Sequence, residues 1–403
     1  MLKQQEMTEL VNSLNRRQDE RSLLYAMAAG LIAFSIMLFG LTMLYSTSFA
    51  TVGEKFLYAQ LRWAFIGTAA MLTVIFLGYR RIGSWCPWLL SLLAILLIWA
   101  ALSKPINGAN RWIIIPWSNM RFQPSEMAKV VLSLYGAQII ADNLRNVADF
   151  RKFKQLIRPA VIIGVILLLV VAGKDLGTTL LLATAMGSLA FSGGLQKRLL
   201  LVIPIVLAVL TLYLTVFDPE RLSRVTSFTN PGDTTLRDTD GYQLWNSQLA
   251  LGSGGLYGIG FMESRMKMRY LPEAHTDFIL AVVGEELGFI GLLCVVAGYL
   301  AFGYFGMKIA LNSRSRYGML LAQTLTLLIV LQAAINIGVV AGGLPTKGIS
   351  APLISYGGSN LLMNMIMVGL LISVGLENVP GLTDNWPLRK KSTPALENSS
   401  LPK

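Results

Sequence analysis

The chain has 403 residues, of which 54% are hydrophobic and only 14% are charged, and its formal net charge is +12. A soluble domain carries roughly a quarter charged residues. Here the apolar residues come in runs of about 20, the length of a membrane-spanning helix. The basic residues lie in short clusters between these runs, as topology determinants do, and this pattern argues against nucleic acid as a partner. The composition therefore predicts an all-α polytopic membrane protein.

About ten apolar segments are candidates for membrane-spanning helices. Lysine and arginine are more abundant in the two terminal segments and in alternate loops than in the remaining short loops. Because such residues mark the cytoplasmic side, we expect both termini in the cytoplasm, in agreement with an even number of spans. The predicted spans are residues 23–46, 60–79, 84–102, 124–141, 158–173, 176–193, 197–217, 276–307, 317–341 and 359–377.

The chain is predicted to form one membrane domain between two polar tails. Residues 1–22 are polar and precede a full-length span, so we expect an N-terminal cytoplasmic tail followed by an uncleaved anchor. Within the membrane domain, residues 23–377, the stretch 218–276 is too long for a simple connection and is predicted to be a large extracytoplasmic loop between the seventh and eighth spans. Residues 378–403 are polar with Pro and Ser, which is typical of a disordered tail.

The densest group of polar residues comes directly before the eighth span. The segment Tyr270–Phe278 contains two carboxylates, Glu273 and Asp277, and the only histidine of the chain, His275. Partial desolvation at a membrane rim makes a carboxylate a better proton acceptor. Asp277 can alternatively cap the eighth helix by accepting a hydrogen bond from its first turn. The spacing alone leaves both interpretations open.

Two further carboxylates, Glu285 and Glu286, fall inside the eighth span. A charged group within the membrane is costly unless it faces the bundle interior and is paired. We therefore predict that they are structural polar anchors, with a direct catalytic role as the alternative. In the short outer turn between the fifth and sixth spans, Lys174 and Asp175 are predicted to form a local pair.

Charged and aromatic residues lie in the outer segment before the fourth span and in the first turns of that span. Glu126 and Lys129 are three residues apart and can pair on one helix face. Arg111 beside Trp112 either holds an anionic headgroup or forms a plain pair in the interfacial aromatic belt.

The loop before the last span carries one charge, Lys347, which suits a phosphate contact. It is followed by Pro352–Gly358, in which Ser355 precedes glycines that allow a close backbone approach.

Taken together, these motifs resemble the SEDS family (shape, elongation, division, sporulation), from the first span to about residue 377. Within the family, Leu344-Pro-Thr-Lys-Gly348 resembles the division members, with the elongation members as a second choice. The segments that carry the resemblance are Asn110-Arg-Trp112, Phe122-Gln-Pro-Ser-Glu126, Asp175-Leu-Gly177, Gly241-Tyr-Gln243, Leu271–Phe278, Gly284-Glu-Glu-Leu-Gly288 and Pro352–Gly358.

The resemblance implies a peptidoglycan glycosyltransferase in the bacterial cytoplasmic (inner) membrane, expected at the division septum. Members of the family polymerise lipid II, a polyprenyl-pyrophosphate-linked disaccharide peptide, into glycan strands at the outer face of the cytoplasmic membrane. They work with a class B penicillin-binding protein, which supplies transpeptidation. The resemblance implies this partner here, together with other divisome membrane proteins.

The resemblance also implies roles for individual residues. The family's essential acidic residue falls on Asp277, which we expect to act as the base of an inverting reaction or to hold a divalent cation such as Mg²⁺ or Mn²⁺. Its important lysine falls on Lys347, which with Arg111 would neutralise the departing pyrophosphate. Further substrate contacts are expected from Trp112, Glu126, Lys129, His275, Glu273 and Ser355, and support from Glu285, Glu286 and Asp175.

Some positions depart from the family pattern, and other functions remain open. Arg269 replaces an acidic residue of the division members, which puts in doubt any regulatory role at that position and leaves the division label open. A lipid II flippase would need polar groups along a path across the whole membrane, whereas the ionisable groups here favour the outer half. A non-catalytic divisome scaffold would leave the concentration of outer carboxylates unexplained.

Overall fold

The computed structural model describes residues 2–49, 53–105, 109–114, 121–143, 154–194, 228, 241–268, 270–345, 348–377 and 379, without the side chains of residues 2–17, 154 and 155. The described elements are almost all helical, apart from one short antiparallel pair of strands. They are α1 (Leu2–Phe49), α2 (Lys55–Leu77), α3 (Tyr79–Ser84), α4 (Cys86–Leu102), β1 (Ile113–Ile114), β2 (Arg121–Phe122), α5 (Pro124–Asp142), α7 (Lys154–Ala172), α8 (Leu176–Ser192), α12 (Tyr242–Gly254), α13 (Ile279–Asn312), α14 (Arg316–Val340) and α15 (Gly358–Leu376).

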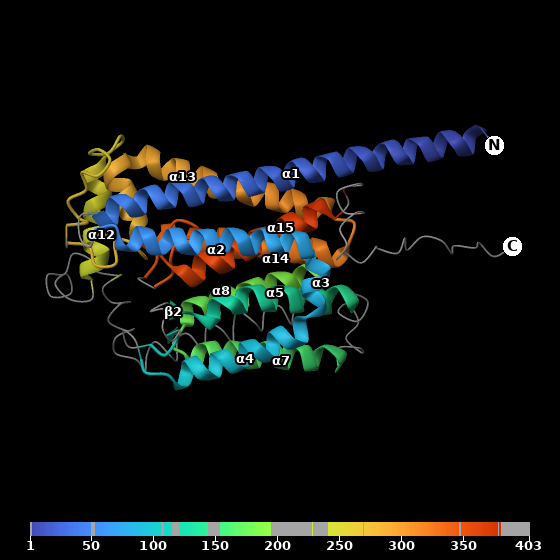
Figure 1. The fold of residues 1–403 in the computed structure, drawn as a ribbon, viewed down its shortest axis with the longest axis horizontal. Helices are drawn as coiled ribbons and strands as arrows, with labels where there is room; N and C mark the ends of the chain where they lie inside the picture. Colours follow the sequence, from blue (N-terminus) through green and yellow to red (C-terminus); the bar gives the residue numbers. More distant parts are fainter. Residues whose placement is uncertain are drawn as a thin grey trace.

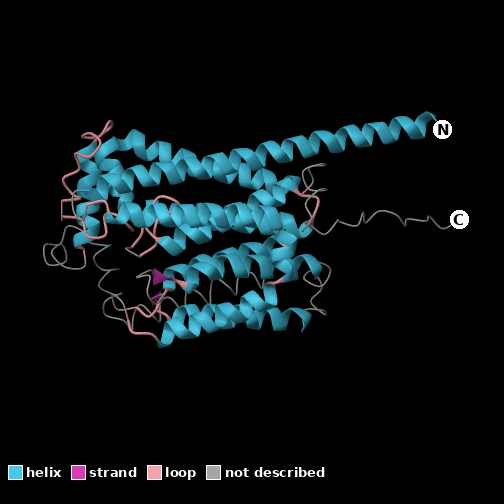
Figure 2. Ribbon diagram, viewed as in Figure 1, coloured by secondary structure: helices cyan, strands magenta, loops and turns pink. Residues whose placement is uncertain are grey.

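The long helices run side by side along one direction and form an elongated bundle (Figure 1). Both α12 and β2 lie at one end of this bundle, and the N-terminal part of α1 projects beyond the other end. Figure 2 shows the two short strands β1 and β2 and several loops at the end with α12. We call this end of the bundle the loop end.

The helices have the length and composition of a multi-pass membrane protein, as predicted. In the described part of the chain, five helices are long and apolar enough to cross a membrane, namely residues 18–49 of α1, α2, α13, α14 and α15. Cys86–Leu102, Leu156–Ala172 and Leu176–Ser192 are shorter apolar helices. Nine of the predicted spans coincide with helices that the structure describes. The predicted span 197–217, the tail beyond residue 379 and most of the predicted loop 218–276 lie outside the described residues.

The core of the bundle is built around α15. It packs against α2, α1, α14 and α5, and most of its side chains are buried, including the polar Asn360 and Asn364. On the other side of α14, α13 packs against α1 and α12. The loops that join these helices at the loop end are thereby brought together.

The eighth predicted span, which is longer than a bilayer requires, is broken rather than straight. Gly288 within α13 has φ 69° and ψ −167°, a conformation that favours glycine. The break exposes backbone groups that must find partners inside a membrane protein. They find them in the loop after α12, through Ile259 N to Glu285 O (3.0 Å), Gly260 N to Glu286 O (3.1 Å), Phe289 N to Gly255 O (2.9 Å) and Ile290 N to Leu256 O (3.2 Å).

Candidate functional site

The side chains of Asp277 and Arg111 converge on one point at the loop end, next to Gly348. A methyl group built on Gly348 would lie 3.1 Å from Asp277 Oδ2 and 3.5 Å from Arg111 Nη2. These residues come from the segment before α13, the loop after α4 and the loop before α15. Three loops at the loop end thus bring together an acid, a guanidinium and the backbone of a glycine. We refer to Asp277, Arg111 and Gly348 as the acid–guanidinium site.

Asp277 does not cap the eighth helix in the way that the spacing allowed. The helix begins at Ile279, so its N-cap position falls on Phe278 and not on Asp277. Asp277 is partly buried, and its Oδ2 atom faces Gly348. The carboxylate therefore lies at the acid–guanidinium site, and the alternative that the sequence also offered, contact with a ligand there, stays a prediction.

The segment before α13 is held in a tight turn. Glu273 has φ 57°, and its carbonyl oxygen accepts hydrogen bonds from Thr276 N (3.1 Å) and Phe278 N (3.3 Å). Its carboxylate accepts from Thr276 Oγ1 at 2.7 Å and remains exposed. The turn therefore fixes the backbone around Asp277 while leaving Glu273 at the surface. A substrate contact by Glu273 stays a prediction.

His275 lies in an aromatic cluster. Its ring stacks on Phe56 with centroids 4.5 Å apart and lies 5.7 Å from the ring of Tyr356. The carbonyl oxygen of His275 accepts a hydrogen bond from Tyr356 N at 2.9 Å, which joins the segment before α13 to the loop before α15. Burial lowers the pKa of His275, and the nearby carboxylate of Glu273 only partly opposes this effect. We therefore expect the ring to be neutral at pH 7.

We predict that the protein loses stability as the pH falls below the unfolded pKa of histidine, about 6.5. The native state, with its lowered pKa for His275, binds fewer protons there than the unfolded state, so stability rises with pH through this window. Melting temperatures in detergent between pH 7.5 and 5.5 measure the effect. The variant His275→Phe, which keeps the stack, should show a smaller drop than the wild type. An equal drop in both proteins would assign the pH dependence to other groups.

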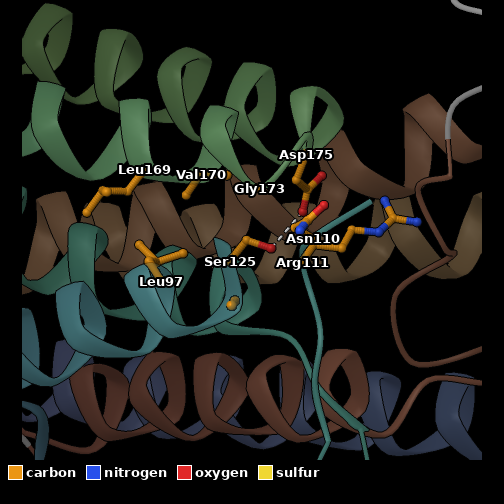
Figure 3. Close-up of a pocket in the computed structure, with 9 residues that line it drawn as sticks. Leu97, Asn110, Arg111, Ser125, Leu169, Val170, Gly173 and Asp175 are labelled. Carbon is orange, nitrogen blue, oxygen red and sulfur yellow. Dashed lines mark hydrogen bonds between the residues drawn. The ribbon is translucent and has the colours of Figure 1, made fainter. Parts of the chain in front are cut away.

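Arg111 is positioned by its neighbours on both sides. Its Cζ atom lies 6.0 Å from the ring of Trp112, within the range of a cation–π contact. The two interpretations of this pair, a headgroup contact or an aromatic-belt pair, stay predictions. Its Nε atom is buried and has no hydrogen-bond partner within the part of the chain that the structure describes. Arg111 also lines a cavity of about 10 Å³ with Asn110, Ser125 and Asp175, among others. Figure 3 shows its guanidinium pointing away from Asp175. The cavity has room for about one water molecule.

Asp175 lines this cavity and accepts hydrogen bonds from residues around it. Its carboxylate accepts hydrogen bonds from Ser125 Oγ (2.6 Å), Gln123 Nε2 (2.8 Å) and Thr178 N (3.2 Å), the last of which caps α8. The predicted local pair with Lys174 is therefore wrong, because the carboxylate turns inward to these three donors. Asp175 thus joins the start of α5 to the start of α8, which fits the supporting position expected for it.

Glu126 and Lys129 form the predicted pair, with Glu126 Oε2 2.6 Å from Lys129 Nζ. The ammonium also donates to Gln332 Oε1 of α14 at 2.7 Å, and Lys129 is completely buried. The pair therefore joins α5 to α14 inside the bundle. Direct contact of either residue with a substrate stays a prediction, because both residues are buried.

The loop before α15 contains two further predicted contacts. Ser355 is buried, and its hydroxyl accepts a hydrogen bond from Ala351 N at 2.8 Å, which closes a turn of the loop. Lys347 lies outside the described residues, between Pro345 and Gly348. Ligand contacts by both residues stay predictions. Gly348 nevertheless shows that the backbone next to Lys347 reaches the acid–guanidinium site.

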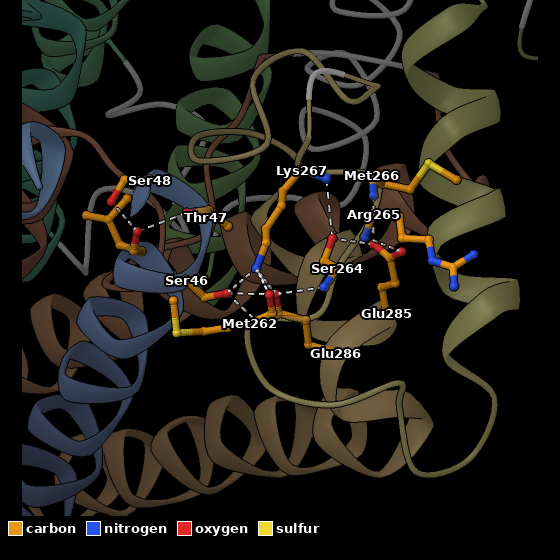
Figure 4. A network of polar contacts seen from close by, with 11 residues as sticks. Ser46, Thr47, Ser48, Met262, Ser264, Arg265, Met266, Lys267, Glu285 and Glu286 are labelled. Carbon is orange, nitrogen blue, oxygen red and sulfur yellow. Dashed lines mark hydrogen bonds and ion pairs between the residues drawn. The ribbon is translucent and has the colours of Figure 1, made fainter. Parts of the chain in front are cut away.

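Glu285 and Glu286 are buried anchors, with the contacts expected of structural groups. Glu285 accepts from Arg265 N at 3.0 Å and from Ser264 Oγ, and Glu286 accepts from Ser46 Oγ of α1 at 2.7 Å. Figure 4 shows these residues around Lys267, whose Nζ lies 2.7 Å from Glu286 Oε1. The two carboxylates thereby fix the loop that leads to Asp277 against α13 and α1.

The sequence interpretation missed three residues of this region, Lys267, Gln332 and Asn336. A signal was present for each. Two adjacent carboxylates in a span require a cation, and Lys267 lies in the outer stretch just before that span. Gln332 and Asn336 are four residues apart in an apolar helix, so their amides share one face.

Gly348 offers a graded test of the acid–guanidinium site. We predict that Gly348→Ala lowers activity about tenfold and Gly348→Val further, because each added methyl crowds Asp277 and Arg111. The matched control is Gly343→Ala in the same loop, where a methyl would meet only Gly338 O at 3.4 Å. Steady-state turnover, with melting temperature to check folding, measures the effect. Equal activity of Gly348→Val and Gly343→Ala would show that the reaction does not need the space between Gly348, Asp277 and Arg111.

An apolar cavity lies beside the acid–guanidinium site. It has a volume of about 180 Å³ and opens between α8, α14 and the loop that follows α14. Its wall includes Ile349, the residue after Gly348, so one loop borders both the polar site and the apolar cavity. The lining residues are Gly177, Leu180, Ile335, Val339, Leu344, Pro345 and Ile349. Such a pair of adjacent surfaces suits an amphiphilic ligand.

Comparison with known proteins identifies many relatives of the chain. A probable peptidoglycan glycosyltransferase FtsW of Geobacter metallireducens is 36% identical over 372 residues, which cover 90% of this chain and 96% of that protein. The protein of the same name from Coxiella burnetii is 37% identical over 289 residues, which cover 71% of this chain and 76% of that protein.

Solved structures show the same architecture. A chain from a peptidoglycan synthase complex, described by its structural coordination of polymerization and crosslinking, matches with a TM-score of 0.73 and 26% identity, covering 87% of this chain and 98% of that chain. The rod shape determining protein RodA of Thermus thermophilus matches with a TM-score of 0.64 and 25% identity, covering 87% of this chain and 96% of that chain.

A family model confirms the resemblance that the motifs indicated. The model, described as a cell cycle protein, covers FtsW, RodA and SpoVE and matches residues 24–379, which include every described transmembrane helix except the start of α1. The curated relatives above carry the FtsW name, in agreement with the division-type motifs. The chain belongs to the FtsW/RodA/SpoVE family of cell cycle proteins.

Proposed function

We propose that the chain is a peptidoglycan glycosyltransferase that polymerises lipid II at the outer face of the cytoplasmic membrane. The observation that carries this proposal is the convergence of Asp277 and Arg111 on Gly348, beside an apolar cavity. The names of the FtsW relatives support the same activity. The loop end of the bundle is then the outer face, and both termini are cytoplasmic, as the distribution of lysine and arginine predicts.

The acid–guanidinium site has the groups that the reaction needs. The 4-hydroxyl of the acceptor sugar attacks C1 of the donor, the bond from C1 to the pyrophosphate oxygen breaks, and the hydroxyl proton passes to the Asp277 carboxylate. Arg111, assisted by Lys347, neutralises the charge that develops on the departing pyrophosphate. One base is sufficient because an α-linked donor gives a β-linked product by direct inversion.

A divalent cation such as Mg²⁺ or Mn²⁺ could share the pyrophosphate with these basic groups. Among the residues that the structure describes, no three His, Cys, Asp or Glu side chains gather as a metal-binding group. Asp277 together with the pyrophosphate oxygens would supply the oxygen ligands that such a cation prefers. The substrate would therefore contribute most of the ligands.

The apolar cavity supports a lipid-linked substrate. Lipid II joins a charged pyrophosphate to a polyprenyl chain, so its binding site must place a polar and an apolar surface next to each other. Ile349 and Gly348 are consecutive residues that face these two surfaces. We propose that the first isoprene units of the donor lie against Ile335, Val339 and Ile349.

The partner is proposed to be a class B penicillin-binding protein. One solved relative comes from a peptidoglycan synthase complex that coordinates polymerization and crosslinking. Glycan strands made by this chain would need a transpeptidase to be crosslinked. Location at the division septum and contacts with other divisome proteins rest on the FtsW name of the relatives.

The test of this function is polymerisation of fluorescent lipid II by the purified chain in detergent, with and without its transpeptidase partner. Detergent micelles offer no second leaflet, so a flippase would produce no polymer under these conditions. We expect glycan strands that lysozyme degrades, with a higher yield when the partner is bound. Absence of strands with the partner shown to be bound would return the chain to the flippase and scaffold alternatives.

A further inference from the structure

Two amide side chains of α14 hold the loop that carries Gly348. Gln332 Nε2 donates to Ser350 O at 2.8 Å, and Asn336 Nδ2 donates to Ile349 O at 2.7 Å. Both residues are almost fully buried and lie one turn apart on the same face of the helix. Loop backbone inside a membrane bundle needs such donors for its carbonyl oxygens. This loop is therefore fixed to α14 at two consecutive residues.

Asn336 also holds the segment that carries the acid. Its Nδ2 donates to Asp277 O at 2.8 Å, so a single amide group bonds to the backbone of both sides of the acid–guanidinium site. Only the NH₂ end of the amide can serve two carbonyl oxygens. The Oδ1 end has no hydrogen-bond partner among the described residues. The side chain is therefore oriented entirely by its two bonds to Asp277 and Ile349.

We infer that Asn336 is a positioning residue that sets the gap between the Asp277 carboxylate and the Gly348 backbone. The inference rests on the proposed function, because the gap matters only if Asp277 takes part in the reaction. A displacement of about 1 Å in a catalytic group can cost about a hundredfold in rate. Loss of the amide removes one hydrogen bond from each segment at once, while the turn at Glu273 and the bond from Gln332 to Ser350 O remain.

Gln332 links the loop that carries Gly348 to the buried ion pair of α5. Its Oε1 accepts from the buried Lys129 at 2.7 Å, and Lys129 in turn pairs with Glu126. The ion pair therefore acts on the loop through Gln332 and does not reach Asp277. Because Asn336 bonds to both segments and Gln332 to only one, substitution of Asn336 has the larger effect on turnover.

The experiment compares Asn336→Leu with a matched control, Asn246→Leu, in lipid II polymerisation with the partner present. Asn246 is also a buried asparagine, but its amide donates to Tyr242 O of its own helix at 3.0 Å. We expect Asn336→Leu to lower kcat about 30- to 100-fold, with KM changed less than about threefold. The control should lose less than about threefold. If Asn336→Leu does not fold, Asn336→Gln, which keeps the NH₂ group on a longer side chain, replaces it with a smaller expected loss.

A double-mutant cycle separates positioning from a general structural role. Asn336→Leu combined with Gly348→Ala should lose less activity than the product of the single losses, because the loosened loop accommodates the added methyl group. Asn246→Leu combined with Gly348→Ala should give the product. The inference is overturned if the losses of Asn336→Leu and Gly348→Ala multiply in the double variant, or if Asn336→Leu leaves kcat unchanged. In either case the proposed function stands as long as the wild type makes glycan strands. A wild type that makes no strands overturns both.

Discussion

Replacement of Asp277 by asparagine is expected to abolish most of the polymerase activity, with kcat reduced at least about 1,000-fold. The amide keeps the size of the side chain but cannot take the proton of the attacking hydroxyl, and general-base catalysis contributes typically 10²- to 10⁴-fold. Binding of lipid II should change little, because Arg111 and the apolar cavity remain. Single-turnover polymerisation and a separate lipid II binding assay measure the two effects.

The control for Asp277→Asn is Glu263→Gln, which removes an exposed carboxylate from the same outer segment. We expect it to retain at least half of the wild-type activity. Strand yields from Asp277→Asn equal to those from Glu263→Gln would remove Asp277 as the base. Glu273 would then be the next carboxylate to test, because it lies at the surface of the same turn.

Loss of the cation from the buried pair between Lys267 and Glu286 is expected to give the largest effect on stability. Both side chains are almost completely buried, so Lys267→Met leaves the Glu286 carboxylate without its counter-charge inside the bundle. Removal of one partner from such a pair costs about 3–5 kcal/mol. Arg265→Met, two residues away with an exposed side chain, should change stability by less than about 0.5 kcal/mol.

A second substitution tests the physical cause of that loss. Lys267→Met combined with Glu286→Gln removes both charges and should recover most of the stability lost by Lys267→Met alone. Denaturant unfolding in mild detergent, followed by tryptophan fluorescence, compares Lys267→Met, Arg265→Met and the double variant. If the double variant is less stable than Lys267→Met, then the hydrogen bonds of Glu286 to Ser46 and Ser264 outweigh its charge.

The fold could be predicted from the sequence wherever hydrophobicity alone decides the structure. The spans follow from apolar runs, and nine of them coincide with described helices. The extension of α1 back to Leu2 was not predicted, because the polar residues 2–22 give no membrane signal although they remain helical. The break at Gly288 was also missed, since it depends on partners in the loop 255–260, far away in the sequence.

The candidate site could be predicted in part, because the topology places the outer loops together. Asp277 and Arg111 were expected at one rim, and they converge on Gly348. Long-range partners could not be predicted in this way. Nothing local to Asn336 indicates that it bonds to Asp277 and Ile349. The two carboxylates of α13 indicate that a cation is needed, but they do not identify Lys267 as that cation.

The most direct test is a structure of the Asp277→Asn protein bound to lipid II. We predict that the pyrophosphate lies within hydrogen-bond distance of Arg111 and of the backbone next to Gly348. The first isoprene units should occupy the cavity lined by Ile335, Val339 and Ile349. A headgroup bound at the opposite end of the bundle, or away from Arg111 at the loop end, would contradict the assignment of the reaction to the acid–guanidinium site.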